Sequence, residues 1–297
     1  MNNKQNTAKL QLIISMVIFG TIGIFRKYIP LPSSVIALVR GLVGALFLIV
    51  VALLSKTKIS GQAFKKNALY LFFSGAFIGF NWILLFEAYN NTSVAVATLC
   101  YYMAPVIVIL LSPIVVKEKL DTKKWLCIIT ALVGMIFVSG VLNNSIKDVS
   151  EIKGVLFALG AATLYAFVIL LNKKIKDISS NDKTIYQLGI AAITLLPYTM
   201  FTEKISVGDF GVKTLLLLLL VGVLHTGITY YMYFGSLGAL PAQTAALYSY
   251  IDPIVAIILS ALLLKEQFGL FEFIGTLLVL GSTIVCDIPL NTSKNKQ

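Results

Sequence analysis

Two matching patterns inside long apolar segments constrain the fold of this chain more than any other feature. Residues Tyr101–Pro105 place a proline one turn after a tyrosine, and Ser249–Pro253 repeat the arrangement 148 residues later in a chain of 297. Lys117-Glu118 and Lys265-Glu266 are separated by the same interval. We interpret the chain as a tandem duplication. Proline-interrupted apolar segments at corresponding positions of two halves indicate a ligand site where the halves meet.

The composition is typical of a membrane protein. Hydrophobic residues make up 58% of the chain, charged residues 12%, and the mean hydropathy is +0.90, whereas soluble domains carry about 25% charged residues. A helix needs roughly 20 apolar residues to cross a bilayer. Ten such spans are predicted, at residues 10–29, 33–54, 67–88, 94–116, 123–141, 153–172, 183–201, 212–235, 242–264 and 268–288. They use most of the chain and leave no room for a soluble domain.

The duplication and the distribution of positive charge together predict the topology. Five spans are an odd number, so the second repeat, 147–297, must be inverted relative to the first, 1–146. With a cytoplasmic N-terminus, sixteen lysines lie in inner segments and seven basic residues in outer ones. This distribution follows the positive-inside rule and places both termini in the cytoplasm. The predicted fold class is an all-α membrane protein with ten transmembrane helices, arranged as two inverted five-helix repeats around a central cavity.

Several landmarks recur in the same order in the two halves. The first half contains Phe19-Gly20, Arg26-Lys27, Arg40, residues 88–95, Ala104-Pro105 and Lys117-Glu118, and the second contains Tyr165-Ala166, residues 236–242, Asp252-Pro253 and Lys265-Glu266. Together with ten spans and five-plus-five symmetry, these landmarks resemble the EamA-type branch of the drug/metabolite transporter superfamily. The resemblance covers nearly the whole chain.

The resemblance implies both a fold and a range of activities. It implies two inverted five-helix bundles with a central cavity lined mainly by the first, third, fourth, sixth, eighth and ninth helices. Family members mostly move small metabolites and often export amino acids, while some are importers or exchangers. The related four-helix multidrug branch has an acidic residue in its first span, whereas Gln11–Phe25 contains neither Asp nor Glu here. A proton-coupling glutamate at that place is excluded.

Ionisable residues within spans are candidates for coupling or polar recognition, because each costs roughly 2.5–3.5 kcal/mol at a helix centre on insertion scales. Asp252, beside Pro253, could bind a substrate ammonium or a proton. Alternatively, it could hydrogen-bond its own interrupted helix or a neighbour such as Ser249. His225, the single histidine of the sequence, could relay protons or form an interhelical hydrogen bond.

For the remaining charged candidates, the position in the sequence favours a structural role. Glu87 lies about one turn from the outer boundary, where a carboxylate that snorkels to the rim is favoured over a buried carrier. For Arg40, about two turns into the second span, pairing with an acidic group or contact with outer headgroups is favoured. Glu118 and Glu266 follow equivalent spans, and we interpret them as partners of the dipole at the start of the next helix.

Aromatic residues at the depth of the two prolines form the other part of the predicted site. The predicted substrate-binding residues are Asn81, Trp82, Tyr101, Tyr102, Tyr165, Tyr230 and Tyr250. Their depth beside the expected kinks at Pro105 and Pro253 argues against an interfacial aromatic belt. Such a cavity suits an amphipathic solute, with its apolar part on the rings and its amine or carboxyl group on the polar residues.

Small residues are expected to let helices approach closely around this cavity. Gly75-x-x-x-Gly79 supplies one such face, and Gly227 corresponds to Gly79 in the second repeat.

The sequence therefore predicts a secondary active transporter of the cytoplasmic membrane. It would export small amphipathic metabolites such as amino acids by alternating access, with proton coupling through Asp252. An importer or exchanger of a small polar or cationic nutrient is the alternative. A membrane enzyme or sensor subunit is disfavoured, because the sequence has one histidine and no acidic pair within a span.

Cofactors and other partners follow from what the sequence contains. The pattern Gly-x4-Gly-Lys-[Ser/Thr] does not occur, which excludes a P-loop ATPase. Cys100, Cys127 and Cys286 lack metal-ligand spacing, so neither a metal nor a cofactor is expected. A small-molecule substrate and membrane lipids are the expected partners, without nucleic acid. The sequence leaves open whether the unit is a monomer or a homodimer.

Overall fold

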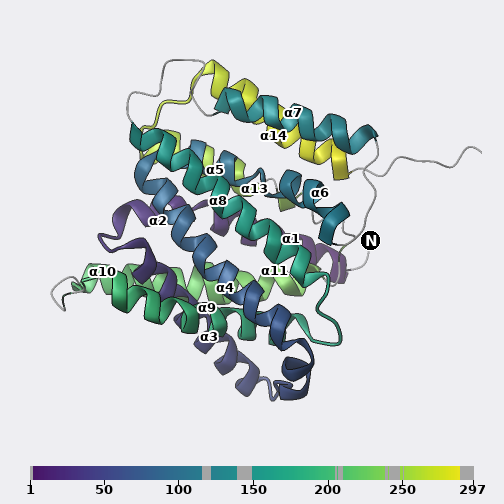
Figure 1. Ribbon diagram of the computed structural model, residues 1–297. Coiled ribbons are helices and arrows are strands. Elements are labelled where there is room, and N and C mark those ends of the chain that lie inside the picture. Colours follow the sequence, from purple (N-terminus) through teal and green to yellow (C-terminus); the bar gives the residue numbers. More distant parts are fainter. Residues whose placement is uncertain are drawn as a thin grey trace, which may run out of the picture.

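The computed structural model describes residues 3–115, 122–138, 149–204, 206, 210–237, 240, 248–249 and 251–287, and every regular element within them is a helix (Figure 1). The first half contains α1 (Asn3–Gly20), α2 (Ile22–Tyr28), α3 (Ser33–Leu54), α4 (Gly61–Asn91), α5 (Val94–Tyr101), α6 (Ala104–Val115) and α7 (Thr122–Val138). The second half contains α8 (Val149–Asn172), α9 (Ser180–Thr202), α10 (Val212–Leu220), a π-helix (Val221–Ile228), α11 (Thr229–Leu237), α13 (Ile251–Leu263) and α14 (Leu270–Asp287). In Figure 1, α7 and α14 pair along one edge, and α3 and α9 lie at the opposite edge.

Several of these helices are long and apolar enough to cross a bilayer, so the chain is a multi-pass membrane protein. Within the described residues, the seven such segments are Gln5–Tyr28, Ser33–Leu54, Gly61–Asn91, Val94–Val115, Val149–Asn172, Ser180–Thr202 and Val212–Tyr233. The other three predicted spans correspond to α7, with 17 residues, to α13, with 13, and to α14, whose apolar part is Leu270–Ser282. The predicted number of ten spans is therefore not established, because 139–141, 242–247 and 288 fall outside the described residues.

The sequence underestimated the length of two helices. α1 begins at Asn3 and not near residue 10, and α4 extends beyond the predicted 67–88 at both ends. A hydropathy window finds only the apolar part of a helix, whereas a polar first turn can continue it into the interface. In α4 the start is fixed by Ser60, whose side chain accepts a hydrogen bond from the Ala63 N–H at 3.2 Å.

Three membrane-spanning segments are interrupted near their middle. Thr21 separates α1 from α2, Tyr102 and Met103 separate α5 from α6, and the π-helix joins α10 to α11. Pro105 and Pro253 lie in the first turns of α6 and α13. There a missing N–H costs little, because the first N–H groups of a helix have no intrahelical acceptor.

Hydrogen bonds at the two ends of α3 and α9 show that these equivalent helices run antiparallel. The Ser34 hydroxyl, at the start of α3, donates to Glu203 Oε1 just beyond α9 at 2.7 Å. At the opposite ends, the Ser60 N–H after α3 donates to Asp182 Oδ2 at the start of α9, at 3.2 Å. Asp182 follows Ser34 by 148 residues, so the same position of each repeat contacts the segment beyond the end of the opposing helix.

The helices α5 and α13, which belong to corresponding spans of the two repeats, form a second antiparallel pair. The Val94 N–H at the start of α5 donates to Glu266 Oε2 beyond the end of α13, at 2.8 Å. Tyr102, just after α5, hydrogen-bonds Asp252 at the start of α13 at 2.9 Å. The two halves therefore run in opposite directions in both of these pairs.

Reciprocal glycine contacts give independent support for a pseudo-twofold relation. A Cβ placed on Gly79 of α4 would lie 2.9 Å from Leu195 of α9, and one placed on Gly227 would lie 2.5 Å from Phe47 of α3. Gly227 and Leu195 each lie 148 residues after Gly79 and Phe47. Contacts in which each partner is exchanged for its counterpart are those of an isologous interface.

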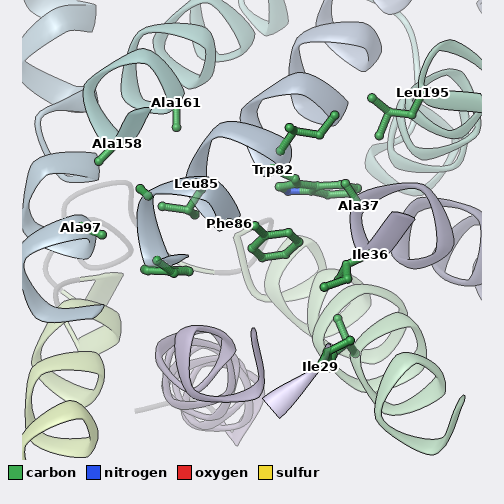
Figure 2. Close-up of a cluster of buried hydrophobic side chains, with 14 of the residues drawn as sticks. Ile29, Ile36, Ala37, Trp82, Leu85, Phe86, Ala97, Ala158, Ala161 and Leu195 are labelled. Atoms are coloured by element: carbon green, nitrogen blue, oxygen red, sulfur yellow. The ribbon is translucent and has the colours of Figure 1, made fainter. Parts of the chain in front are cut away.

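The largest hydrophobic cluster joins the two halves around α4. Trp82 and Phe86 of α4 extend toward α3, where Ala37 lies (Figure 2). Ala161 of α8 and Leu195 of α9 belong to the same buried cluster. In a bilayer, close packing of this kind replaces the hydrophobic effect as the main source of attraction between helices.

Replacing Gly75 by alanine should destabilise the contact between α4 and α9. The new Cβ would lie 2.8 Å from Ile190 Cβ and 2.9 Å from the Gln187 carbonyl oxygen, so the backbones must separate. We expect a net loss of about 1–2 kcal/mol, because overpacking outweighs the higher helix propensity of alanine. Unfolding of the purified protein in detergent measures this difference.

Gly189→Ala is the matched control for that substitution. A Cβ at Gly189 of α9 meets nothing within 4 Å, so this variant should match or slightly exceed the parent in stability. Equal stability of the two variants would contradict the close approach at Gly75.

Candidate functional site

A cavity of about 420 Å³ lies at the centre of the molecule, between the two halves. This volume falls in the range of small-molecule sites. The residues that line it are Met16, Phe19, Ile22, Arg40, Ile78, Asn81, Trp82, Leu85, Tyr89, Thr98, Tyr101, Tyr102, Ala104, Pro105, Tyr165, Val168, Ile169, Asn172, Gln187, Tyr230, Tyr233, Ser249 and Asp252. Asp252 and Arg40 are the two charged groups among these lining residues.

Most of the residues singled out in the sequence meet at this cavity. Asn81, Trp82, Tyr101, Tyr102, Tyr165, Tyr230, Arg40, Asp252 and Pro105 all line it. His225, Glu87 and Pro253 do not belong to its lining, and Tyr250 lies outside the described residues. The geometry brings the predicted residues together, while their binding of a substrate stays a prediction.

Tyr102 connects the two halves beside Pro253. Its hydroxyl lies 2.9 Å from Asp252 Oδ2 and 3.1 Å from the Ser249 carbonyl oxygen. Pro253 has no N–H, so the Ser249 carbonyl cannot receive a helical hydrogen bond from that residue. The tyrosine of one half thus contacts both a carboxyl group and a backbone carbonyl of the other half. Ser249 was expected as a neighbour of Asp252, whereas the bridging role of Tyr102 was not.

Aromatic rings form the walls of the cavity from several helices. The Tyr101 ring packs at 5.6 Å from Tyr165 and at 6.5 Å from Tyr102. On the side of α1, Phe19 packs edge-on against Tyr230 at 5.4 Å and Tyr233 at 6.0 Å. These walls offer apolar faces and hydroxyl groups to the same space.

Asn81 is held in the wall by a backbone contact with the other half. Its side-chain amide donates to the Ala161 carbonyl of α8 at 2.6 Å. Its carbonyl oxygen lies 3.5 Å from the Tyr101 hydroxyl. The side chain therefore fixes α4 against α8 and orients one wall of the cavity.

Arg40 does not have either of the structural roles favoured from the sequence. It is 4% exposed, so it does not reach the headgroups, and the ion pair found among the described residues joins Lys66 to Asp177. Instead, Arg40 Nε donates to Thr226 Oγ1 at 3.0 Å, and its guanidinium carbon lies 4.2 Å from the Trp82 ring centroid. Sequence position alone could not reveal this, because it does not fix the rotation of a helix.

His225 forms the interhelical contact that the sequence left as one of two alternatives. Its Nε2 lies 2.8 Å from the Thr21 hydroxyl, at the break between α1 and α2. The Thr21 hydroxyl donates to the Ile18 carbonyl at 2.7 Å, so we assign the proton of the first hydrogen bond to Nε2. The ring also packs edge-on against Phe25 at 4.9 Å. This geometry fixes the first span, and it does not place His225 in the cavity wall.

Glu87 and Glu266 do not line the cavity. Glu87 is half-buried. The Glu266 carboxylate caps α5 of the other half and not the helix that follows it, so the expected capping of the next helix was wrong for this residue. The error arose because sequence proximity does not reveal contacts between repeats. Glu118 lies outside the described residues.

The sequence reading missed several polar residues of the lining. Tyr89 and Thr98 both belong to the cavity wall, with 3.3 Å between their hydroxyl oxygens. The Gln187 amide donates to Ser74 and to Asn172, both at 2.7 Å. Their signal in the sequence is a neutral polar side chain within a span, whereas the predicted site contained Asn81 as its one residue of that kind. Among the described residues, no three His, Cys, Asp or Glu side chains form a group suited to a metal ion.

Two opposed repeats that meet at a central cavity are typical of membrane transporters. The chain belongs to the EamA-like transporter family, whose model matches it twice, at residues 6–140 and 152–286. The resemblance seen in the sequence is thus confirmed.

Curated relatives support this assignment along almost the whole chain. The uncharacterized transporter YxxF of Bacillus subtilis is 32% identical over 278 residues, which cover 94% of this chain and 88% of the relative. The uncharacterized transporter YoaV of the same organism is 25% identical over 263 residues, with 88% of each chain covered. A crystal structure with 17% sequence identity has a TM-score of 0.64 and covers 95% of this chain and 97% of its own. That last likeness shows the fold.

Tyr102→Phe should weaken the connection between α5 and α13. Removing a hydroxyl that donates to a carboxylate should cost about 1–2 kcal/mol of unfolding free energy, since membrane hydrogen bonds are worth somewhat less than comparable bonds to charged groups in water. Unfolding in detergent, combined with Asp252→Asn in a double-mutant cycle, measures the coupling.

Tyr101→Phe provides the matched control for this cycle. The Tyr101 hydroxyl makes a long contact of 3.5 Å with Asn81, so its loss should have little effect. Additive effects of Tyr102→Phe and Asp252→Asn would show that the two side chains do not interact.

Proposed function

We propose that the protein is a secondary active transporter of the cytoplasmic membrane that exports small amphipathic metabolites such as amino acids. The observation that supports this proposal is the Tyr102–Asp252 hydrogen bond at the wall of the central cavity, which joins the first half to the second. A carboxyl group placed there can respond both to a proton and to a solute.

Alternating access requires that contacts at the two ends of the molecule open in turn. The Ser34–Glu203 and Val94–Glu266 hydrogen bonds tie the halves at one end, and the Ser60–Asp182 hydrogen bond ties them at the other. Because these contacts involve equivalent elements of opposed repeats, rocking of one half against the other can exchange the closed end.

Protonation of Asp252 would change the hydrogen bonds between the halves. When Asp252 is ionised, the single Tyr102 hydroxyl proton points to the carboxylate. When Asp252 is protonated, its own O–H can donate to Tyr102, and the Tyr102 proton can turn to the Ser249 carbonyl at 3.1 Å. Proton binding would therefore alter the link between α5 and α13, which is the physical basis we propose for coupling.

The proposed orientation places both termini in the cytoplasm. It rests on the excess of lysine in the segments that would then face inward.

Fusions at the C-terminus test this orientation in bacterial cells. A fluorescent protein that matures only in the cytoplasm should be bright, whereas alkaline phosphatase at the same position should be inactive, because it folds only outside. Active phosphatase with a dark fluorescent fusion would reverse the proposed topology.

Asp252→Asn should abolish the response of transport to a pH gradient. The parent, reconstituted in liposomes, is expected to move one solute class from a panel of amino acids and small amines when a gradient is applied. The variant cannot bind and release a proton at this site, so the gradient should no longer accelerate its flux, while exchange without a gradient continues. Mass spectrometry of the liposome contents measures both.

Glu87→Gln is the matched control, since it removes a carboxylate outside the cavity lining. It should retain gradient-driven flux. A full pH-dependent flux of Asp252→Asn would refute coupling through Asp252, and flux only in the inward direction would favour an importer. A lack of transport for every panel member by the folded parent would contradict the proposed solute class.

A further inference from the structure

We infer that Arg40 binds the carboxylate of the transported solute, which makes the site selective for organic acids and zwitterions over amines. This inference rests on the proposed transport function. It concerns the charge of the solute, whereas the proposal above concerns movement and coupling.

The guanidinium group of Arg40 is oriented with one edge toward the cavity. Its Nε is used by Thr226, and its plane is supported by Trp82 and, at 5.6 Å, by Phe86. Within the described residues, Nη1 and Nη2 make no hydrogen bond, and the residue lines the cavity. Four N–H groups therefore remain available to a ligand.

A buried guanidinium needs an anionic partner, and the described part of the protein supplies none at ion-pair distance. A guanidinium stays charged in proteins, and burial of a charge is costly unless it is paired. The ion pair found among the described residues joins Lys66 to Asp177, on the exposed surface. A ligand carboxylate at Arg40 would neutralise the buried charge.

The arginine is held in place by close helix packing, so the site is formed before a ligand binds. A Cβ at Gly44, one turn beyond Arg40 on α3, would lie 2.5 Å from Thr226 Cγ2. Glycine at this position lets Thr226 approach α3 and reach the guanidinium. Thr226 also donates to the Val221 carbonyl five residues earlier, at 3.2 Å, a spacing that belongs to the π-helix.

The rest of the lining favours a carboxylate over a phosphate. The planar fork of Arg matches the two oxygens of a carboxylate. Arg40 is the one basic residue among the lining residues, and Asp252 adds an acidic group, so the lining is poorly suited to a dianion. Phe19, Tyr101 and Tyr165 provide faces for the apolar part of the same solute.

Trp82 supplies a direct readout of occupancy. The sequence has two tryptophans, and Trp125 on α7 is 50% exposed and does not line the cavity. In a Trp125→Phe background, the fluorescence of Trp82, 4.2 Å from the guanidinium, should change when a ligand binds at Arg40. The probes are L-phenylalanine, 3-phenylpropionate, phenethylamine and inorganic phosphate.

The two probes with a carboxylate should give saturable fluorescence changes, and phenethylamine and phosphate should bind at least about tenfold more weakly. Arg40→Gln should weaken binding of the carboxylates by about 10- to 100-fold, as expected for a lost charged hydrogen-bond pair, without changing the response to phenethylamine. Arg40→Lys keeps the charge but loses the planar fork, so its affinity for the carboxylates should lie between that of the parent and that of Arg40→Gln. Arg26→Gln is the control, because Arg26 is also buried but does not line the cavity.

The comparison of probes on the parent needs no substitution at Arg40, so it holds even where a variant fails to fold. Equal binding of phenethylamine and phenylalanine, no binding of either carboxylate, or undiminished carboxylate binding by folded Arg40→Gln would each overturn the inference. If the inference holds but the transport proposal fails, the result differs. Arg40-dependent binding of a probe would then be seen in detergent, with no flux of the same probe into or out of liposomes.

Discussion

The interior of a bilayer offers no water, so each polar group within the spans must find its partner inside the protein. This constraint explains how the polar residues of the described structure are arranged. Tyr102 contacts the carboxyl group of Asp252 and the carbonyl of Ser249, and Thr21 and His225 hold the break between α1 and α2. Interruptions are tolerated where side chains from other elements complete the hydrogen bonds. The cavity forms where those elements converge.

The same constraint makes the π-helix central to the arrangement. Its neighbouring residues His225 and Thr226 contact two different helices, through Thr21 of the first span and Arg40 of α3. An additional residue in a helical turn rotates the side chains that follow it, which is one reason why such segments occur at functional sites. Here that rotation connects the interruption of one span with the orientation of the cavity's arginine.

The fold and much of the site could be predicted from the sequence, because duplication and hydropathy can both be recognised from the order of the residues alone. Tyr102, Asp252 and Trp82 were identified from their depth beside the repeated prolines, and they do line the cavity. The support of Arg40 by Trp82 and the capping of α5 by Glu266 could not be predicted. Both depend on helix rotation and on contacts between repeats, neither of which a single sequence specifies.

The position equivalent to Asp252 in the first half is Ala104, which also lines the cavity. The two halves thus share a backbone plan and differ in the group that titrates. If the halves exchange conformations during a cycle, the carboxyl group always travels with α13, and the two end states place it in unlike surroundings. The symmetry of the scaffold makes the two states geometrically comparable, while this single substitution removes their energetic equivalence. In a duplicated protein of this kind, the residues in which the copies have diverged set how unequal the energies of the two states are.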